Sequence, residues 1–156
     1  MTQIKINELM ITYPESFHEM DETEKAGMNF FKEGPGVCLS APELHILVSI
    51  GWKKSGFASL LVSEKEAAEN GEKQIRKAMS VNGYQLDKYT EYTLDGKAAY
   101  GYRYTYQVQD VGMTGENVVL KNNKVFYYLN FYARTELMAD SLPVWQEMLD
   151  SIHFGS

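Results

Sequence analysis

Tyrosine recurs at every second position of residues 99–107, AYGYRYTYQ, where it occupies positions 100, 102, 104 and 106. Successive side chains of a β-strand point to opposite faces, so the four rings would share one face. Such a row could stack bases or sugars, and each stacked base contributes about 1–3 kcal/mol in single-strand binders. That use requires a positive groove, whereas this chain has a formal net charge of −6. We therefore expect no nucleic-acid binding, and we interpret the tyrosine face as a sheet face covered by a helix.

The other residue types that do chemistry lie too far apart to form a site. The three histidines, at positions 18, 45 and 153, lack the short spacing of metal ligands. The acidic run EMDETEK lacks the spacing of a calcium loop, so we interpret it as solvated charge. The stretch GPGVCLS lacks the lysine of a phosphate-binding loop. We expect no catalytic residues, no metal and no cofactor; enzyme activity stays open, with a non-catalytic role favoured.

The chain carries no sign of targeting or of a membrane span. The N-terminal segment MTQIKINELMITYP has no basic stretch followed by a long apolar run, and the longest apolar run, VFYYL, is too short to cross a membrane. The only cysteine, Cys38, allows no intramolecular disulfide and is typical of a small core residue. We expect a cytoplasmic protein whose residues 1–156 form a single domain.

Strand and helix signals alternate along the chain. A first strand is predicted over Ile4–Tyr13, and a second over Leu44–Trp52, where one face is strongly apolar. Ser63 and Glu66 have the spacing of a capping box, so a helix should begin there and end before Gly83. Residues 58–62 could form a separate short helix.

Residues 84–134 have the pattern of consecutive antiparallel strands. Asp95-Gly96 between alternating runs predicts a tight hairpin, and Asn122-Asn123 predicts a second one because Asn tolerates positive φ. The intervening VQDVGMTGEN, with two glycines, predicts a looser turn.

The strand VFYYLNFYAR is apolar on both faces. One face carries Val125, Tyr127, Leu129, Phe131 and Ala133, and most of the other carries Phe126, Tyr128 and Tyr132. Such a strand should be central and covered twice. A last helix in DSLPVWQEMLDSIHF, with Asp140 or Ser141 as its cap and Pro143 in its first turn, would supply part of the cover.

Four segments, YPESF, YTLDGKAAYGYRYTY, KVFYYLNFYA and VWQEMLDSIHF, resemble the PsbP-like superfamily, which includes the photosystem PsbP proteins, a Ran-binding import factor and DcrB-type proteins. The matching positions are Tyr13-Pro14, Gly96 to Ala99, Tyr127 to Phe131, and Ser151, Ile152 and Phe154. The resemblance implies an α+β fold: a curved antiparallel sheet, which we expect to have about six strands, with helices packed on both faces (an α/β/α sandwich). It implies no shared catalytic set, and no functional residue carries over.

We infer from these patterns a non-catalytic binding or adaptor protein with a protein or peptide partner. The expected binding residues are aromatic and basic side chains near the sheet edge: Tyr89, Arg103, Tyr128, Tyr132 and Arg134. The alternatives are a carrier of a small apolar ligand, an unrecognised enzyme using a tyrosine-lined pocket in the sheet, or a chaperone for a hydrophobic segment. An exposed edge strand could also pair across a two-fold axis, so a homodimer stays open.

Overall fold

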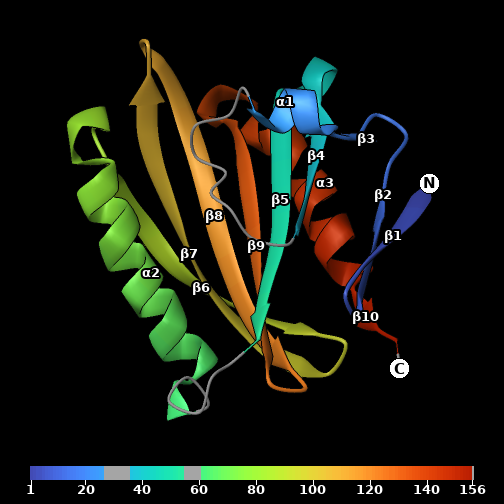
Figure 1. The fold of residues 1–156 in the computed structure, drawn as a ribbon. Coiled ribbons are helices and arrows are strands. Elements are labelled where there is room, and N and C mark those ends of the chain that lie inside the picture. Colours follow the sequence, from blue (N-terminus) through green and yellow to red (C-terminus); the bar gives the residue numbers. More distant parts are fainter. Residues whose placement is uncertain (27–35, 55–60, 156) are drawn as a thin grey trace.

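The protein is represented by a computed structural model that describes residues 1–26, 36–54 and 61–155. These residues form two antiparallel sheets and three α-helices (Figure 1). The main sheet has seven strands in the order β3-β4-β5-β9-β8-β7-β6, and a smaller sheet has the order β1-β2-β10. The expected α+β class is confirmed. The main sheet is one strand larger than expected, and the small sheet was not expected.

The element bounds follow the chain. The strands are β1 (Thr2–Ile6), β2 (Leu9–Tyr13), β3 (His18–Glu19), β4 (Gly36–Ala41), β5 (Ile46–Lys54), β6 (Gln85–Leu94), β7 (Lys97–Val108), β8 (Val111–Asn122), β9 (Val125–Arg134) and β10 (His153–Phe154). The α-helices are α1 (Glu22–Ala26), α2 (Glu64–Ala78) and α3 (Met138–Asp150). Short 3-10 turns occupy Pro42–Leu44, Ser80–Asn82 and Thr135–Leu137.

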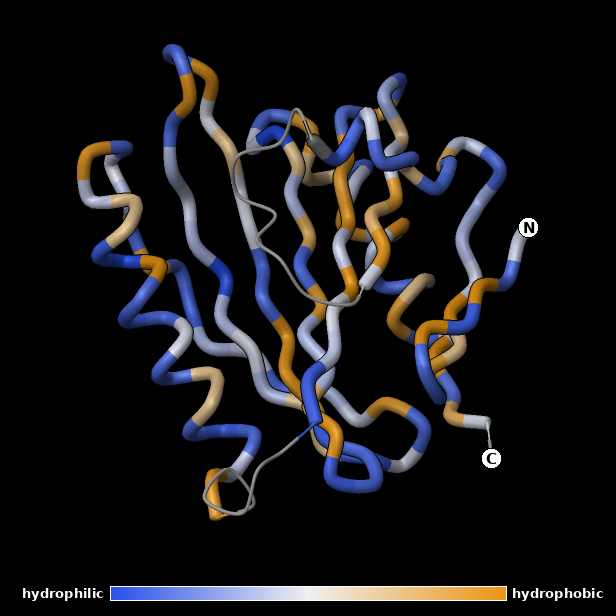
Figure 2. Tube along the Cα trace, in the orientation of Figure 1, coloured by the Kyte–Doolittle hydropathy of each residue, from blue (hydrophilic) through white to orange (hydrophobic). Residues whose placement is uncertain are grey.

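Strand β9 is the middle strand of the seven, as its doubly apolar pattern predicted. Leu129, Phe131 and Ala133 on one face have no exposed surface, and Phe126 on the other face is also buried. Hydrophobic residues run along the central strands, whereas α2 is mostly hydrophilic (Figure 2). The core is therefore divided by the sheet into two clusters, one on each face.

The tyrosine face of β7 is buried against α2. Tyr102, Tyr104 and Tyr106 are buried in one cluster with Ala68 of α2, and their neighbouring ring centroids lie 5.7 Å apart. The Tyr104 ring also lies across Gly115 of β8, where a Cβ atom would overlap the ring. The core interpretation of this face is confirmed.

The opposite face of the sheet is covered by α3 together with the small sheet. Trp145 of α3 stacks on Phe131 with ring centroids 5.1 Å apart. Leu9 and Ile11 of β2 are fully buried in the same cluster, and β2 also contacts α3. The cover on this side is thus part helix and part sheet.

Two predicted segments are divided differently in the structure. The strand expected over Ile4–Tyr13 is a hairpin of β1 and β2, because Asn7 takes a positive φ of 56° and reverses the chain. The looser turn expected in VQDVGMTGEN is a two-residue turn at Gln109-Asp110, where both residues have positive φ. The two glycines of that segment lie within β8, and Gly115 leaves room for the Tyr104 ring.

Other boundaries agree to within a few residues. Ser63 caps α2 by accepting a hydrogen bond from the Glu66 N–H at 3.1 Å, and Gly83 has a φ of 71° after the helix. The turn at Asp95-Gly96 is confirmed, whereas the next turn is at Asn123-Lys124, one residue later than expected. The second predicted strand, Leu44–Trp52, corresponds to β5, which begins two residues later than expected. The helix predicted over 58–62 lies largely outside the described residues.

Helix α3 begins earlier than the sequence suggested. Its cap is Leu137, which makes no capping hydrogen bond through its side chain, because a 3-10 turn leads from β9 directly into the helix. Asp140 therefore lies in the first turn rather than at the cap, and Ser141 is buried inside the helix. Pro143 is also interior, where its missing N–H removes one helical hydrogen bond.

We predict that Gly101→Ala destabilises the protein by about 1–3 kcal/mol. A Cβ atom at Gly101 of β7 would overlap the Asn117 carbonyl oxygen of β8 and lie 2.8 Å from the Thr90 hydroxyl oxygen. The matched control is Gly112→Ala, whose Cβ would meet only the Thr135 side chain, at 3.6 Å, and should change stability by less than about 1 kcal/mol. Urea unfolding measures both; equal effects would contradict the close strand packing.

Candidate functional site

A groove of about 400 Å³ lies between α2 and the strands β6 and β7. It is lined by Lys65, Ala68 and Glu69 of α2, by Tyr89, Thr90 and Glu91 of β6, and by Tyr100 and Gly101 of β7. Strand β6 is the last strand of the main sheet, and within the described part of the chain no strand pairs with its outer edge. The groove therefore borders an open sheet edge.

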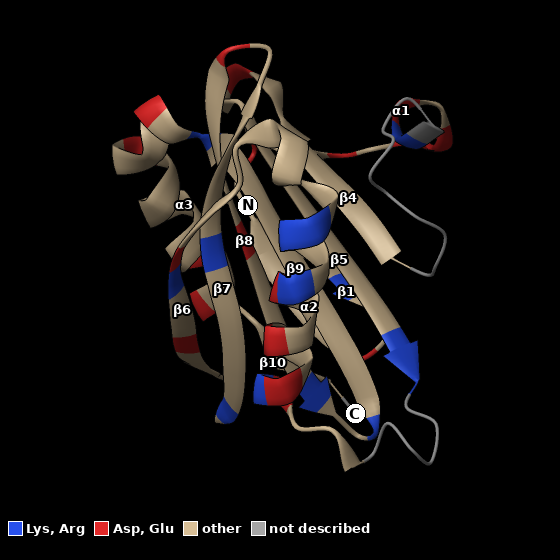
Figure 3. Ribbon diagram, turned by 90° about the vertical axis from the view of Figure 1, so that its left-hand side faces the viewer, with Lys and Arg blue, Asp and Glu red and all other residues tan. Residues whose placement is uncertain are grey.

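Small residues on α2 set the position of the helix above the sheet. Ala68 is buried, and a Cβ atom on Gly71 would lie 3.4 Å from the Tyr102 hydroxyl. The helix contacts β7 and β8 most extensively, so it lies over the middle of the tyrosine face and to one side of β6. Along its length α2 carries charges of both signs (Figure 3).

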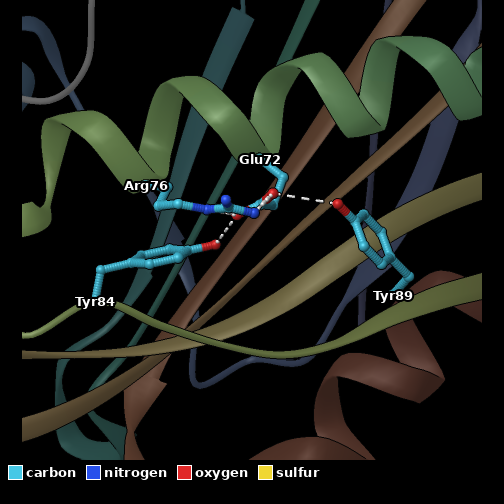
Figure 4. A network of polar contacts seen from close by, with 4 residues as sticks. All are labelled: Glu72, Arg76, Tyr84 and Tyr89. Atoms are coloured by element: carbon cyan, nitrogen blue, oxygen red, sulfur yellow. Dashed lines mark hydrogen bonds and ion pairs between the residues drawn. The ribbon is translucent and has the colours of Figure 1, made fainter.

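A buried carboxylate joins α2 to the strand beside the groove. Glu72 has no exposed surface, and its Oε2 accepts hydrogen bonds from Arg76 Nε and from the Tyr84 hydroxyl, both at 2.8 Å (Figure 4). Its Oε1 accepts from the Tyr89 hydroxyl at 3.2 Å and from the Arg76 guanidinium. We call these four residues the Glu72 cluster; it fixes the Tyr89 ring at the wall of the groove.

Burial and hydrogen bonding oppose each other in the Glu72 cluster. Burial favours the neutral form of Glu72, but the hydrogen bonds from Arg76, Tyr84 and Tyr89 outweigh it and hold the pKa of Glu72 below its usual value. Burial, the nearby Glu72 charge and the hydrogen bond to it raise the pKa of Tyr89, with a smaller contribution from the charge of Glu69. The cluster is therefore a charged acceptor surrounded by protonated donors at neutral pH.

The five residues expected to bind a partner are not brought together. Tyr89 lines the groove and is 50% exposed. Arg103 lies on the opposite face of the sheet, where its guanidinium pairs with Glu116 at 3.2 Å. Tyr128, Tyr132 and Arg134 alternate along β9, so they lie on the central strand and not near a sheet edge as expected.

The face that carries Arg103 has a second buried carboxylate. Glu116 of β8 is buried and accepts hydrogen bonds from the Tyr92 hydroxyl at 2.6 Å and from Trp145 Nε1 at 3.0 Å. The Arg103 guanidinium completes the set. Because α3 and the sheet enclose these groups, we interpret them as a structural link between the two layers.

Sequence reasoning missed Glu72 and Glu116, although each leaves a signal. Glu72 falls four residues after Ala68 and three before Ile75, so it lies on the apolar stripe of α2, with Arg76 one turn further on. Glu116 lies on the same face of β8 as Val118 and Leu120, because the three residues are two positions apart. A carboxylate in register with core residues indicates a buried, partnered group.

Metal and thiol chemistry find no support within the described residues. No group of three or more His, Cys, Asp or Glu side chains there could hold a metal ion. His18 pairs with Glu24 at 2.8 Å on the surface. Burial raises the pKa of the Cys38 thiol, which disfavours the reactive thiolate. Among the helices of the described ranges, none has the length and apolar character needed to span a membrane.

Comparison with solved structures shows that the chain has the PsbP-like fold. Cyanobacterial PsbP (CyanoP) from Synechocystis sp. PCC 6803 matches with a TM-score of 0.69 and 12% identity, over 99% of this chain and 92% of that one. LpqN, involved in cell envelope biogenesis of Mycobacterium tuberculosis, matches with a TM-score of 0.59 and 12% identity, over 99% of this chain and 90% of LpqN. The Ran-binding protein Mog1p of Saccharomyces cerevisiae matches with a TM-score of 0.59 and 6% identity, over 98% of this chain and 94% of Mog1p. No family model and no curated protein matches the sequence.

We predict that Glu72→Gln lowers the free energy of unfolding at pH 7 by about 1–3 kcal/mol, because the charge-assisted hydrogen bonds are lost. The pKa of folded Glu72 lies below its unfolded value, so this stabilisation is complete above about pH 5 and disappears as the pH falls through the folded-state pKa. The wild type should therefore lose more stability than Glu72→Gln between pH 7 and pH 3.

Urea unfolding at several pH values measures this difference. The control is Glu147→Gln, which removes an exposed carboxylate on α3 and should leave the pH profile of the wild type unchanged. Parallel profiles for the wild type and Glu72→Gln would contradict a charged, hydrogen-bonded Glu72.

Proposed function

We propose that this chain is a non-catalytic binding or adaptor protein whose partner is a protein or peptide, bound at the α2–β6 groove. The observation that carries the proposal is the position of this groove beside the outer edge of β6, which no strand of the described ranges covers. An exposed edge offers unpaired backbone N–H and C=O groups to an extended segment, and a neighbouring groove can receive its side chains.

The part of β6 that borders the groove is regular enough to accept a further strand. The register of β6 against β7 shifts between Leu86 and Lys88, which is a bulge that weakens pairing at that end. From Lys88 to Leu94 every residue pairs in sequence with β7. The groove residues Tyr89, Thr90 and Glu91 all belong to this regular part.

Proteins of the same fold support a binding role by analogy. The Mog1p structure is described as that of a Ran-binding protein, so at least one chain with this fold binds another protein. We interpret the layers of the present chain as the α/β/α sandwich expected from its sequence, and we treat residues 1–156 as one domain. We also propose that the protein is located in the cytoplasm.

The carrier alternative has weaker support. The rings of Tyr102, Tyr104 and Tyr106 are buried under α2 in contact with one another, so the tyrosine face is occupied by the protein's own core. The groove is lined by the charged residues Lys65, Glu69 and Glu91, which suits a polypeptide better than a small apolar ligand.

We predict that Tyr89→Ala reduces capture of the native partner from a lysate at least about tenfold, because it removes the aromatic wall of the groove. The double variant Tyr132→Ala, Arg134→Ala tests the other expected binding residues in parallel. Val81→Ala, at a 91% exposed position outside the groove, is the control and should behave as the wild type. Quantitative mass spectrometry of the captured proteins measures the change.

Two outcomes would argue against the proposal. If the wild type and Tyr89→Ala capture the same partners in equal amounts, the groove is not the binding site. A stoichiometric small molecule in the native mass spectrum of the gently purified protein would favour the carrier alternative.

A further inference from the structure

The groove carries an acidic residue on each of two of its walls. Glu69 comes from α2 and Glu91 from β6, and both line the groove. Glu69 is half-buried and Glu91 is exposed, and neither has an ion-pair partner among the described residues, whereas the buried Glu72 and Glu116 each pair with an arginine. Among the described lining residues Lys65 is the only basic one, so these residues together carry one net negative charge.

Two tyrosines line the groove together with these carboxylates. Tyr89 is half exposed and Tyr100 is half buried, and both contribute to the groove. The hydroxyl of Tyr89 donates to the buried Glu72, which fixes the ring in place without using its face. A ring face beside a carboxylate is a favourable environment for a cation, because the ring quadrupole and the charge attract it together.

We propose that the groove binds a lysine or arginine side chain of an extended partner segment, between the carboxylates of Glu69 and Glu91 and the rings of Tyr89 and Tyr100. The inference rests on the proposed function and adds to it the chemistry of the partner. It distinguishes a basic segment from the acidic or apolar segments that an open strand edge would otherwise accept.

The geometry of β6 explains why an extended segment fits. Tyr89 and Glu91 point to the same face of the sheet as Tyr102 and Tyr100, their partners on β7. A segment that pairs with the outer edge of β6 sends every second side chain to that face, next to α2. One basic residue of the segment then lies over the groove, and the formal charge of −6 favours its approach.

The test uses blocked heptapeptides of alternating threonine and valine whose central residue is arginine, norleucine or glutamate. Binding to the full chain is followed by amide chemical shifts and by a titration of affinity at low and moderate salt. We expect the arginine peptide to bind at least about tenfold more tightly than the norleucine peptide, with shifts at residues 69 and 89–91. The glutamate peptide should bind least.

Three variants separate the groove charges from the net charge of the protein. Glu69→Gln with Glu91→Gln should weaken binding of the arginine peptide about tenfold, and Lys65→Gln should tighten it. Glu43→Gln with Glu147→Gln removes the same formal charge at exposed positions outside the groove, and should leave the affinity within about twofold.

The outcomes distinguish the inference from the function on which it rests. Equal affinity for the arginine and norleucine peptides, or an equal loss in both double variants, overturns the cationic partner and leaves the groove as a peptide site. Shifts by the arginine peptide at a surface other than the groove also overturn it. If no peptide binds while Tyr89→Ala still abolishes partner capture, the inference fails and the binding function stands. If both experiments fail, the proposed function fails as well.

Discussion

The arrangement of the whole chain depends on one strand, β9, that can face water on neither side. Its alternate residues are buried in two separate clusters, and it has three strands on each side in the main sheet. Burying both faces requires two covering layers, because a single layer leaves half of the apolar side chains in water. The protein meets this requirement with α2 on one face, and with α3 and the small sheet on the other.

Each covering layer is joined to the sheet by one buried carboxylate. Glu72 links α2 to tyrosines of the strand region on one face, and Glu116 links Trp145 of α3 to Tyr92 and Arg103 on the other. A buried charge is costly unless its acceptor sites are filled, and both carboxylates receive donors on each oxygen. The hydrogen bonds of Glu72 and Glu116 therefore favour a single position of each covering layer on the sheet. Apolar contacts alone would specify that position less strictly.

Sequence patterns predicted the elements whose cause is local. The capping pair Ser63 and Glu66, the turn Asp95-Gly96 and the doubly apolar β9 each act within a few residues, and each is confirmed. One error arose where a distant contact decides the structure. The sequence pattern predicts Gly115 in a loose turn, but it lies inside β8, where the Tyr104 ring of a neighbouring strand occupies the space above it.

In the candidate site, too, the sequence predicts what depends on neighbouring residues better than what depends on distant contacts. Tyr89 was expected to bind as an aromatic residue near the sheet edge, and it does line the groove beside the edge strand β6. Arg103 was expected beside it, yet alternation along β7 places it on the other face, opposite the tyrosines. Glu69 and Tyr100 line the same groove because α2 packs on β7, and no spacing within the sequence indicates that they come together.

The existence of the groove follows from the widths of the elements. Strands lie about 4.8 Å apart and a helix is about 10 Å wide, so one helix covers roughly two strands. Helix α2 covers mainly β7 and β8, so among the described elements β6 lies beside the helix rather than beneath it. On the other side, the sheet fills its face with a hydrogen-bonded polar row, Asn117 to Asn130 and Asn130 to Ser49. Beside β6 the described residues fill this face differently: the Tyr89 hydroxyl donates to Glu72, and Glu69, Glu91 and Tyr100 line the groove between the helix and the strand. This asymmetry supports the proposal that a partner binds at the edge next to α2.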